Sequence, residues 1–383
     1  MKPAVFVLLM LFLLTGCGQT HPAETTIPPT TQPVTEAPTE ETVPPTTEAP
    51  DPLEVLLEMM PTEYKVGQLF LARCPAENAL EDIKTYHLGG YVLFGRDFDG
   101  ETPDSITDTL ARYQLASSIP LLIAVDEEGG TVCRVSSNPA FRAVRFPSPR
   151  NLYASGGMDA VLETEAEKAA LLYSLGINVN LAPVCDMTNK LSSFLYSRSL
   201  GQSPEITGTF AAEAVAIMKE HRVGGVLKHF PGYGDNADTH TGTAIDERSL
   251  EQLESCDLIP FQMGIDSGCG AIMMSHNIIT SLDGDSPATL SPAVHNYLRE
   301  TMGFEGVILT DDLAMGAITE TYGTGEAAVL AVLAGNDILC CTEYREQYQA
   351  VLEAVEDGRI SMEILDTAVM RILKWKQALG LLY

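Results

Sequence analysis

The chain has 383 residues, with 23 Lys and Arg against 52 Asp and Glu, so its formal net charge at pH 7 is −29. Such a charge disfavours binding to nucleic acid and direct docking on anionic lipid. It is compatible with work near cell-wall polymers, although it does not identify a substrate. The sequence is 45% hydrophobic, and residues 53–383 suit one barrel domain better than two average domains.

The first residues have the pattern of a bacterial lipoprotein signal peptide. Lys2 precedes an uninterrupted apolar run, Ala4–Leu14, which is too short to span a bilayer as a mature helix. Leu14-Thr15-Gly16-Cys17 resembles a lipobox. We therefore expect residues 1–16 to be removed and Cys17 to carry acyl chains that hold the protein on the outer face of the cell membrane. The alternative is an ordinary secretory signal with a chance cysteine.

Residues 17–52 have the composition of a disordered tether. After Cys17 the segment is built mostly from Thr, Pro, Glu and Ala, without Lys or Arg. It cannot bury enough apolar surface to offset the entropy lost on ordering. Its prolines and like charges favour extended conformations, so we expect it to carry the globular domain away from the bilayer.

The cysteines do not form a recognisable metal or disulfide pattern. Seven remain after Cys17, without CxxC spacing, and an odd number cannot all pair internally. We interpret most of them as small buried apolar residues. A disulfide framework is the alternative. The seven are Cys74, Cys133, Cys185, Cys256, Cys269, Cys340 and Cys341.

The globular region alternates short apolar runs with longer amphipathic stretches, which is typical of repeated βα units around a parallel sheet. Helical patterns occur at 159–175, 204–221, 250–267, 291–302, 324–334 and 362–379. Eight units predict a closed (β/α)8 TIM-type barrel in a single catalytic domain, with an open doubly wound sheet as the alternative. The eight apolar runs are 67–72, 90–94, 120–125, 178–183, 224–227, 271–274, 306–309 and 337–340.

Polar residues follow five of these runs, directly or within three positions. Because the carboxyl ends of barrel strands meet on one face, we expect residues scattered over the sequence to surround a single cleft. They are Asp126, Asp186, Lys228-His229, Ser275-His276 and Asp311-Asp312.

Four motifs resemble glycoside hydrolase family 3, closest to its β-N-acetylhexosaminidase branch. The similarity extends from about Met60 to the C-terminus. The motifs are Lys228-His229-Phe230-Pro231-Gly232-Tyr233-Gly234-Asp235 with Asp238-Thr239-His240; Asp126-Glu127-Glu128-Gly129-Gly130 with Arg134; Leu181-Ala182-Pro183 with Asp186; and Gly306–Met315.

The resemblance implies that Asp311 is the catalytic nucleophile. A retaining glycosidase needs a carboxylate that attacks the anomeric carbon and forms a glycosyl ester. Paired aspartates at a strand end can instead cap the following helix, and this explanation suits Asp312 better than Asp311.

The resemblance also implies that the general acid is a histidine paired with an aspartate. His240 and Asp238 match that pair. Imidazole titrates near neutral pH, and the aspartate can set its tautomer and stabilise imidazolium. We expect no second domain after the barrel, so no acid from such a domain replaces His240. The alternative is a surface histidine beside an unrelated aspartate.

Five further residues are expected to hold the hydroxyls of the cleaved sugar: Asp126, Arg134, Arg198, Lys228 and His229. Ionised donors and acceptors orient the ring, and contacts that tighten in the transition state increase the rate. For the two arginines the alternative is a salt bridge that braces the barrel rim. We expect Asp186 to orient Lys228 or an arginine, and Ser275 and His276 are weaker candidates.

The sequence thus predicts a monomeric, retaining, exo-acting β-N-acetylglucosaminidase without a metal or organic cofactor. Its expected substrates are wall-derived or chitin-type glycans, and the preference for N-acetylglucosamine comes from the resemblance alone. Two alternatives stay open. One is phosphorolysis, since a histidine acid does not repel phosphate. The other is a non-catalytic glycan-binding lipoprotein on a degenerate barrel.

Overall fold

The computed structural model describes residues 51–236, 239 and 242–383. The expected signal peptide, Cys17, nearly all of the expected tether, and the predicted pair Asp238 and His240 therefore lie outside the described residues. In the part that is described, no helix is both long enough and apolar enough to cross a membrane.

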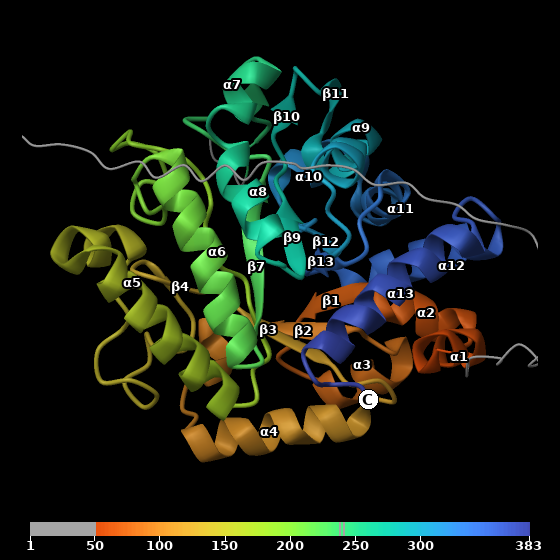
Figure 1. Ribbon diagram of the computed structural model, residues 1–383. Helices are drawn as coiled ribbons and strands as arrows, with labels where there is room; N and C mark the ends of the chain where they lie inside the picture. Colours follow the sequence, from red (N-terminus) through yellow and green to blue (C-terminus); the bar gives the residue numbers. More distant parts are fainter. Residues whose placement is uncertain (1–50, 237–238, 240–241) are drawn as a thin grey trace, which may run out of the picture. The chain divides into compact units, whose positions relative to one another are not determined.

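The core of the domain is a parallel eight-stranded barrel, as predicted (Figure 1). Neighbouring strands follow the order β12-β9-β7-β6-β3-β2-β1-β13, and a parallel bridge between Leu309 and Ile338 joins the two outer strands. The strands are β1 Phe70–Arg73, β2 Gly90–Leu93, β3 Leu122–Val125, β6 Val179–Asn180, β7 Gly224–Phe230, β9 Ala271–Met274, β12 Val307–Thr310 and β13 Leu339–Cys341.

Helices surround this barrel (Figure 1) and bury the outer faces of its strands. Every residue of β2, β3, β9 and β12 is buried, which explains why these strands appear in the sequence as continuous apolar runs. The helices are α1 Pro52–Met59, α2 Thr62–Gln68, α3 Ala79–Tyr86, α4 Pro103–Ala116, α5 Pro149–Ser174, α6 Pro204–Glu220, α7 Leu250–Glu254, α8 Leu258–Asp266, α9 Pro292–Asn296, α10 Gly316–Tyr322, α11 Thr324–Ala334, α12 Tyr344–Glu356 and α13 Met362–Ala378.

Serine caps fix where many of these helices begin. In each case the hydroxyl accepts a hydrogen bond from a backbone N–H of the first turn, a group that has no partner inside the helix. In three of them a proline follows the serine at the first helical position, where its missing N–H costs nothing. The capping residues are Ser148 of α5, Ser203 of α6, Ser249 of α7, Ser291 of α9 and Ser361 of α13.

Several predicted boundaries were wrong. Residues 67–69 do not belong to the first strand, because Gly67 and Gln68 complete α2 and β1 begins at Phe70. The helix predicted to begin at residue 159 begins at Pro149 and bends at Gly157, whose φ is 69°. The helix predicted over 250–267 is divided into α7 and α8, and the break holds Asp257 2.6 Å from Arg248 Nη1.

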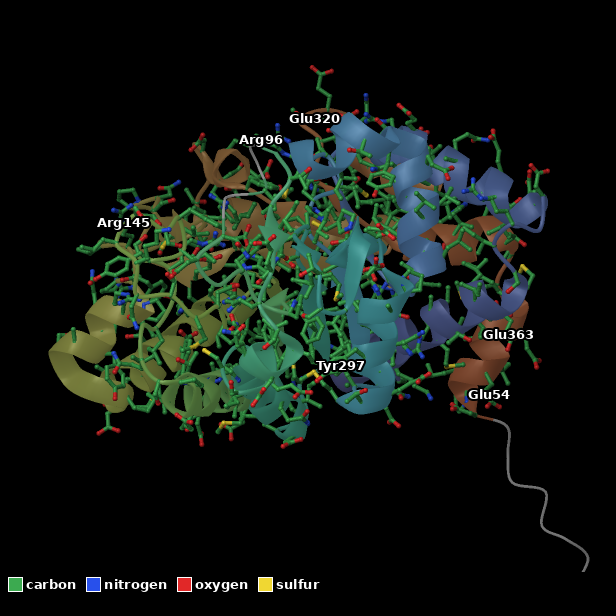
Figure 2. The ribbon with its side chains drawn as sticks, turned by 90° about the horizontal axis from the view of Figure 1, so that it is seen from above. Glu54, Arg96, Arg145, Tyr297, Glu320 and Glu363 are labelled. Carbon is green, nitrogen blue, oxygen red and sulfur yellow. The ribbon has the colours of Figure 1, made fainter. Side chains whose placement is uncertain are left out.

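The two ends of the described chain lie together on one edge of the barrel. Helix α1 packs against α13, and Figure 2 shows Glu54 of α1 beside Glu363 of α13. Leu53 is buried in this contact, and the side chain of Asp51 accepts a hydrogen bond from Leu53 N to cap α1. The first described helix is therefore part of the packed domain.

Six of the seven described cysteines are buried and one is partly exposed, and all seven are free thiols. This agrees with their interpretation as small apolar residues rather than a disulfide framework. Burial raises the pKa of Cys185, Cys340 and Cys341 well above the usual thiol value, so these groups stay neutral.

Candidate active site

A cavity lies where the carboxyl ends of the strands meet. Its volume of about 270 Å³ is close to the lower end of the range for small-molecule sites, roughly 300–1,000 Å³. All six predicted site residues that the structure describes line it: Asp126, Arg134, Arg198, Lys228, His229 and Asp311. The remaining lining residues are Arg73, Val92, Phe94, Glu128, Val132, Leu181, Phe194, Tyr233, Met273, Asp312, Cys340 and Cys341.

Asp311 directly follows β12 and is held at the cavity wall by the backbone. Its N–H donates to Met274 O at 3.2 Å, and its Oδ1 accepts from Asp312 N at 2.8 Å. Burial raises the pKa of the carboxyl, but His229, His276, the Asp312 amide and Lys228 outweigh burial and hold that pKa below its usual value. Asp311 is therefore an ionised carboxylate, as a nucleophile must be.

Asp312 has a supporting task in the same loop. Its Oδ1 accepts from Ala314 N at 2.9 Å and Thr342 N at 3.2 Å, and its Oδ2 accepts from Thr342 Oγ1 at 2.6 Å. It does not cap the next helix, which begins at Gly316 after the N-cap Met315. Asp312 ties the loop after β12 to the end of β13 and thereby supports the backbone that carries Asp311.

The opposite wall holds a network of paired charges. Lys228 Nζ lies 2.7 Å from both Asp126 Oδ1 and Glu128 Oε1. Arg198 donates to both oxygens of Glu128, at 2.9 and 2.8 Å. Burial raises the pKa of Glu128, but Arg198 and Lys228 hold it far below the usual value. Arg134 lies farther out, with Nη2 3.6 Å from Asp126 Oδ2.

Glu128 is a site residue that the sequence analysis missed, because its neighbour Glu127 has the same chemistry. The two lie on β4 Glu127–Gly129, which forms a hairpin with β5 Val132–Cys133. Adjacent strand residues point to opposite faces, so Glu128 enters the cavity and Glu127 points away from it. Glu127 accepts from the backbone amides of 134, 135 and 136 and shapes this hairpin.

The prediction for Asp186 was wrong. It contacts neither Lys228 nor an arginine. Its Oδ2 lies 2.7 Å from His229 Nδ1 and accepts from His229 N at 3.1 Å, and its Oδ1 accepts from Tyr233 N at 2.8 Å. Asp186 therefore keeps a proton on Nδ1 of His229 and directs Nε2 towards the cavity, where Arg198 Nη2 lies 3.5 Å away.

His276 acts behind Asp311 rather than in the cavity lining. Its Nδ1 lies 2.8 Å from Thr289 Oγ1, and its Nε2 lies 3.1 Å from Asp312 O. Thr289 already donates its hydroxyl proton to Ser275 O at 2.6 Å. The Thr289 hydroxyl oxygen therefore accepts from His276 Nδ1, which fixes the ring behind Asp311.

Two of the three predicted catalytic residues, Asp238 and His240, lie outside the described residues. Thr239, which separates them in the sequence, is described and buried. Its Oγ1 lies 2.7 Å from the hydroxyl of Tyr233, which lines the cavity. Burial and the charge of Asp311 raise the pKa of Tyr233, so its phenol remains protonated.

The barrel, its buried ionised aspartate and the surrounding charged groups define a glycoside hydrolase. Residues 61–375 match the model of the glycosyl hydrolase family 3 N terminal domain. The chain belongs to glycoside hydrolase family 3.

Relatives and solved structures agree with this assignment. The chain is 30% identical over 330 residues to beta-hexosaminidase LpqI of Mycobacterium tuberculosis, covering 82% of each chain. It is 34% identical over 303 residues to a beta-hexosaminidase of Stenotrophomonas maltophilia, covering 76% of this chain and 86% of the relative.

Among solved structures, the M. tuberculosis LpqI structure superposes with a TM-score of 0.77 at 29% identity, covering 85% of this chain and 96% of that one. A family 3 beta-N-acetylglucosaminidase from Paenibacillus sp. strain FPU-7 superposes with a TM-score of 0.79 at 34% identity. That alignment covers 84% of this chain and 63% of the other.

Proposed function

We propose that this chain is a retaining, exo-acting β-N-acetylglucosaminidase that removes terminal N-acetylglucosamine from cell-wall or chitin-type glycans by hydrolysis. The observation that carries the proposal is Asp311, a buried ionised carboxylate in a cavity of about 270 Å³. A cavity this small favours one sugar ring at the chain end over a long internal segment. The names of the relatives, beta-hexosaminidase and beta-N-acetylglucosaminidase, support the choice of sugar.

In the first step Asp311 attacks the anomeric carbon, and the bond to the leaving oxygen breaks as that oxygen takes a proton. The product is a glycosyl ester on Asp311. In the second step water attacks the same carbon, gives up a proton and releases the carboxylate, so two inversions retain the configuration. The cations around Asp311 favour the ionised form that begins and ends this cycle.

The proton donor must come from outside the carboxylates of the described cavity wall. Asp126 is paired with Lys228, and Asp312 accepts from Thr342. Glu128 has its pKa far below the usual value, so it does not carry a proton to deliver. This exclusion supports the sequence-based role of His240 as acid and then base, with Asp238 as its orienting partner.

The paired network is suited to hold the hydroxyls of the bound sugar. Asp126, Lys228 and His229 offer charged or imidazole hydrogen-bonding groups at the cavity wall, and Arg134 and Arg198 lie beside them. Their pairing holds each group in place before substrate arrives, which lowers the entropy lost in orienting the ring. Arg198 is bound to Glu128 along one edge, so it both braces the rim and lines the cavity.

The test is hydrolysis of 4-nitrophenyl β-N-acetylglucosaminide. We expect wild type to release nitrophenol and free sugar, and Asp311→Ala to lose at least about 10⁴-fold in kcat. Asp285→Asn, a change at an exposed aspartate, is the matched control and should retain activity. Equal turnover by wild type and Asp311→Ala would disprove the mechanism. Release of glucose alone from a panel of aryl glycosides would disprove the substrate.

The same assay with and without inorganic phosphate separates hydrolysis from phosphorolysis. We expect free N-acetylglucosamine in both cases. Formation of the sugar 1-phosphate when phosphate is present would show phosphorolysis instead of hydrolysis, because the attacking oxygen in the second step would then come from phosphate.

We also propose that Cys17 is lipidated and tethers the enzyme to the outer face of the cell membrane. The support is the Leu14-Thr15-Gly16-Cys17 motif after the apolar run. We expect the full chain to incorporate labelled fatty acid and to fractionate with membranes, and Cys17→Ala to abolish both. Wild-type protein without label, recovered in the soluble fraction, would contradict the anchor.

A further inference from the structure

The segment 187–201 brings two side chains to the cavity without regular secondary structure of its own. It lies between β6 and α6, contains turns but no helix or strand, and carries Phe194 and Arg198, which line the cavity. The backbone N–H groups of Arg198 and Ser199 donate to Leu195 O at 3.0 and 2.9 Å, which closes one turn. Such bonds fix the turn locally, so contacts from outside the segment must hold it against the barrel.

Arg150 of α5 contacts both ends of this segment. Its Nη2 donates to Thr188 O at 2.7 Å and to Ser199 Oγ at 3.0 Å. Its Nη1 lies 3.5 Å from Asn189 Oδ1, and its guanidinium carbon lies 4.0 Å from the centre of the Tyr196 ring. Because a guanidinium is a rigid planar fork with five N–H donors, this one side chain fixes the start of the segment relative to its end.

The end of the segment closes on the same guanidinium. Gly201 has a φ of 71°, a conformation that favours glycine. A Cβ built on Gly201 would overlap the guanidinium of Arg150, so a larger residue fits there only by displacing that group. Ser199, which accepts a hydrogen bond from Arg150, is buried. The backbone and the arginine are therefore packed tightly against each other.

The position of Arg150 in α5 is unfavourable for the helix itself. It is the second helical residue, after the N-cap Ser148 and Pro149. A cation in the first turn opposes the partial positive charge of the helix amino end. The Nε of Arg150 is also buried without an acceptor among the described residues, which costs further free energy. The stability of α5 does not account for an arginine here, whereas its contacts with segment 187–201 do.

The restraint reaches the active site at two points. Arg198 donates to both oxygens of Glu128, at 2.9 and 2.8 Å. Thr188, whose carbonyl accepts from Arg150, donates its hydroxyl to Asp235 Oδ1 at 2.7 Å, in the loop that follows β7. A shift of the Arg150 guanidinium would therefore move Arg198 along the cavity wall.

We infer that Arg150 is a positioning residue of the glycosidase reaction, which holds Arg198 at the cavity wall although it does not itself line the cavity. This inference rests on the proposed function, in which Arg198 binds hydroxyls of the cleaved sugar. A misplacement of about 1 Å in such a group can lower the rate by about 100-fold. The rigid fork behind the segment thus contributes to the rate through Arg198.

A simpler explanation is that Arg150 only joins α5 to a neighbouring loop and stabilises the fold. A purely structural residue changes the fraction of enzyme that is folded, but leaves kcat/KM per folded molecule unchanged. The effect of an independent residue also adds, in free energy, to that of a site residue. A positioning residue acts through Arg198, so its replacement costs little more once Arg198 has been replaced.

The first experiment is a double-mutant cycle on kcat/KM for 4-nitrophenyl β-N-acetylglucosaminide, with unfolding curves to confirm that each variant is folded in the assay. We expect Arg198→Gln to lose about 100-fold and Arg150→Met about 10- to 30-fold. The double variant should lie within about threefold of Arg198→Gln, and Arg150→Lys should retain an intermediate activity. The inference is overturned if the two losses multiply, or if Arg150→Met loses less than about twofold.

Arg345→Met is the matched control. This arginine also stacks on a tyrosine, with its guanidinium carbon 4.9 Å from the centre of the Tyr344 ring, and pairs with Asp82 at 2.6 Å. Both contacts lie outside segment 187–201. Its kcat/KM should stay within about twofold of wild type. A loss as large as that of Arg150→Met would show that removing any stacked arginine disturbs the site, which also overturns the inference.

Amide hydrogen exchange separates failure of this inference from failure of the proposed function, because it needs no substrate. In Arg150→Met we expect faster exchange in peptides from 187–201 and wild-type exchange in the barrel strands. If this change occurs although wild type hydrolyses no N-acetylglucosaminide, the proposed function is wrong and the placement of the segment by Arg150 stands. Hydrolysis by wild type, with unaltered exchange of 187–201 in Arg150→Met, overturns the inference alone.

Discussion

Two clusters at opposite ends of the barrel each place a carboxylate between two cations, and they behave differently. The mouth cluster is Glu128 between Arg198 and Lys228, with all three side chains lining the cavity. The base cluster is Asp337 between Arg299 at 2.6 Å and Arg371 at 3.0 Å, and Asp337 lies two residues before the first residue of β13. Each consists of a buried carboxylate between two cations.

The balance of burial against pairing differs between them. At the mouth, pairing outweighs burial and the pKa of Glu128 lies far below its usual value. At the base, burial outweighs pairing and the pKa of Asp337 is raised. Asp337 also accepts from Ile308 N at 2.8 Å, so its main task is to join β12 to the start of β13. A carboxylate between two cations therefore indicates neither function nor stability by itself.

The largest effect is expected for Glu128→Gln. The change leaves Arg198 and Lys228 without their shared counter-ion, and breaking a buried pair in this way costs about 3–5 kcal/mol of stability. Both cations then shift in the cavity, so kcat/KM should fall by about 100-fold. Denaturant unfolding and the aryl glycoside assay measure the two effects. If Glu128→Gln kept the kinetics and the stability of wild type, the mouth cluster would not be part of the functional site.

A smaller loss is expected for Asp186→Asn. The carboxylate accepts from two backbone amides and from His229 Nδ1, whereas an asparagine offers only one oxygen acceptor. Loss of one such bond should lower kcat/KM by about tenfold, mainly through the orientation of His229. The proton chemical shift of Nδ1–H should change in parallel. An unaltered shift together with a tenfold loss would mean that Asp186 acts through the Tyr233 loop instead.

Asp337→Asn should have a still smaller effect and so sharpen the contrast between the clusters. The asparagine oxygen can still accept from Ile308 N, and the lost charge was opposed by burial. We expect a stability loss below about 2 kcal/mol and kcat/KM within threefold of wild type. A loss of activity as large as that of Glu128→Gln would show that the base cluster is coupled to the mouth.

The pH dependence of these stability losses should have opposite signs. Because the pKa of Glu128 is depressed in the folded protein, its ionised carboxylate stabilises the fold at pH above the pKa of an unfolded Glu, about 4.3, and this stability is lost as pH falls. The difference in unfolding free energy between wild type and Glu128→Gln should therefore shrink in acid. Because the pKa of Asp337 is raised in the folded protein, wild type loses stability as pH rises above the pKa of an unfolded Asp, about 3.9. The difference in unfolding free energy between wild type and Asp337→Asn should therefore shrink towards neutral pH. Unfolding curves between pH 3 and 7 measure both slopes, and slopes of equal sign would refute the difference.

Much of the cavity could be predicted without coordinates. Asp126, Lys228, His229 and Asp311 each follow an apolar run, and all line one cavity. The parallel barrel explains this success, because it brings every strand's carboxyl end to the same face whatever the loops between them contain. The start of β1 and the division into α7 and α8 were predicted wrongly, because local sequence patterns do not reveal where tertiary contacts end a helix or strand.

What the sequence by itself determined was therefore the barrel and the set of polar residues around its mouth. Which of them pair was decided by tertiary structure. Glu127 and Glu128 are adjacent and chemically identical, yet one shapes a hairpin and the other binds two cavity cations. Asp186 meets His229 rather than Lys228. Such pairings depend on strand faces and on distances of a few ångströms between residues far apart in the chain, which no local pattern encodes.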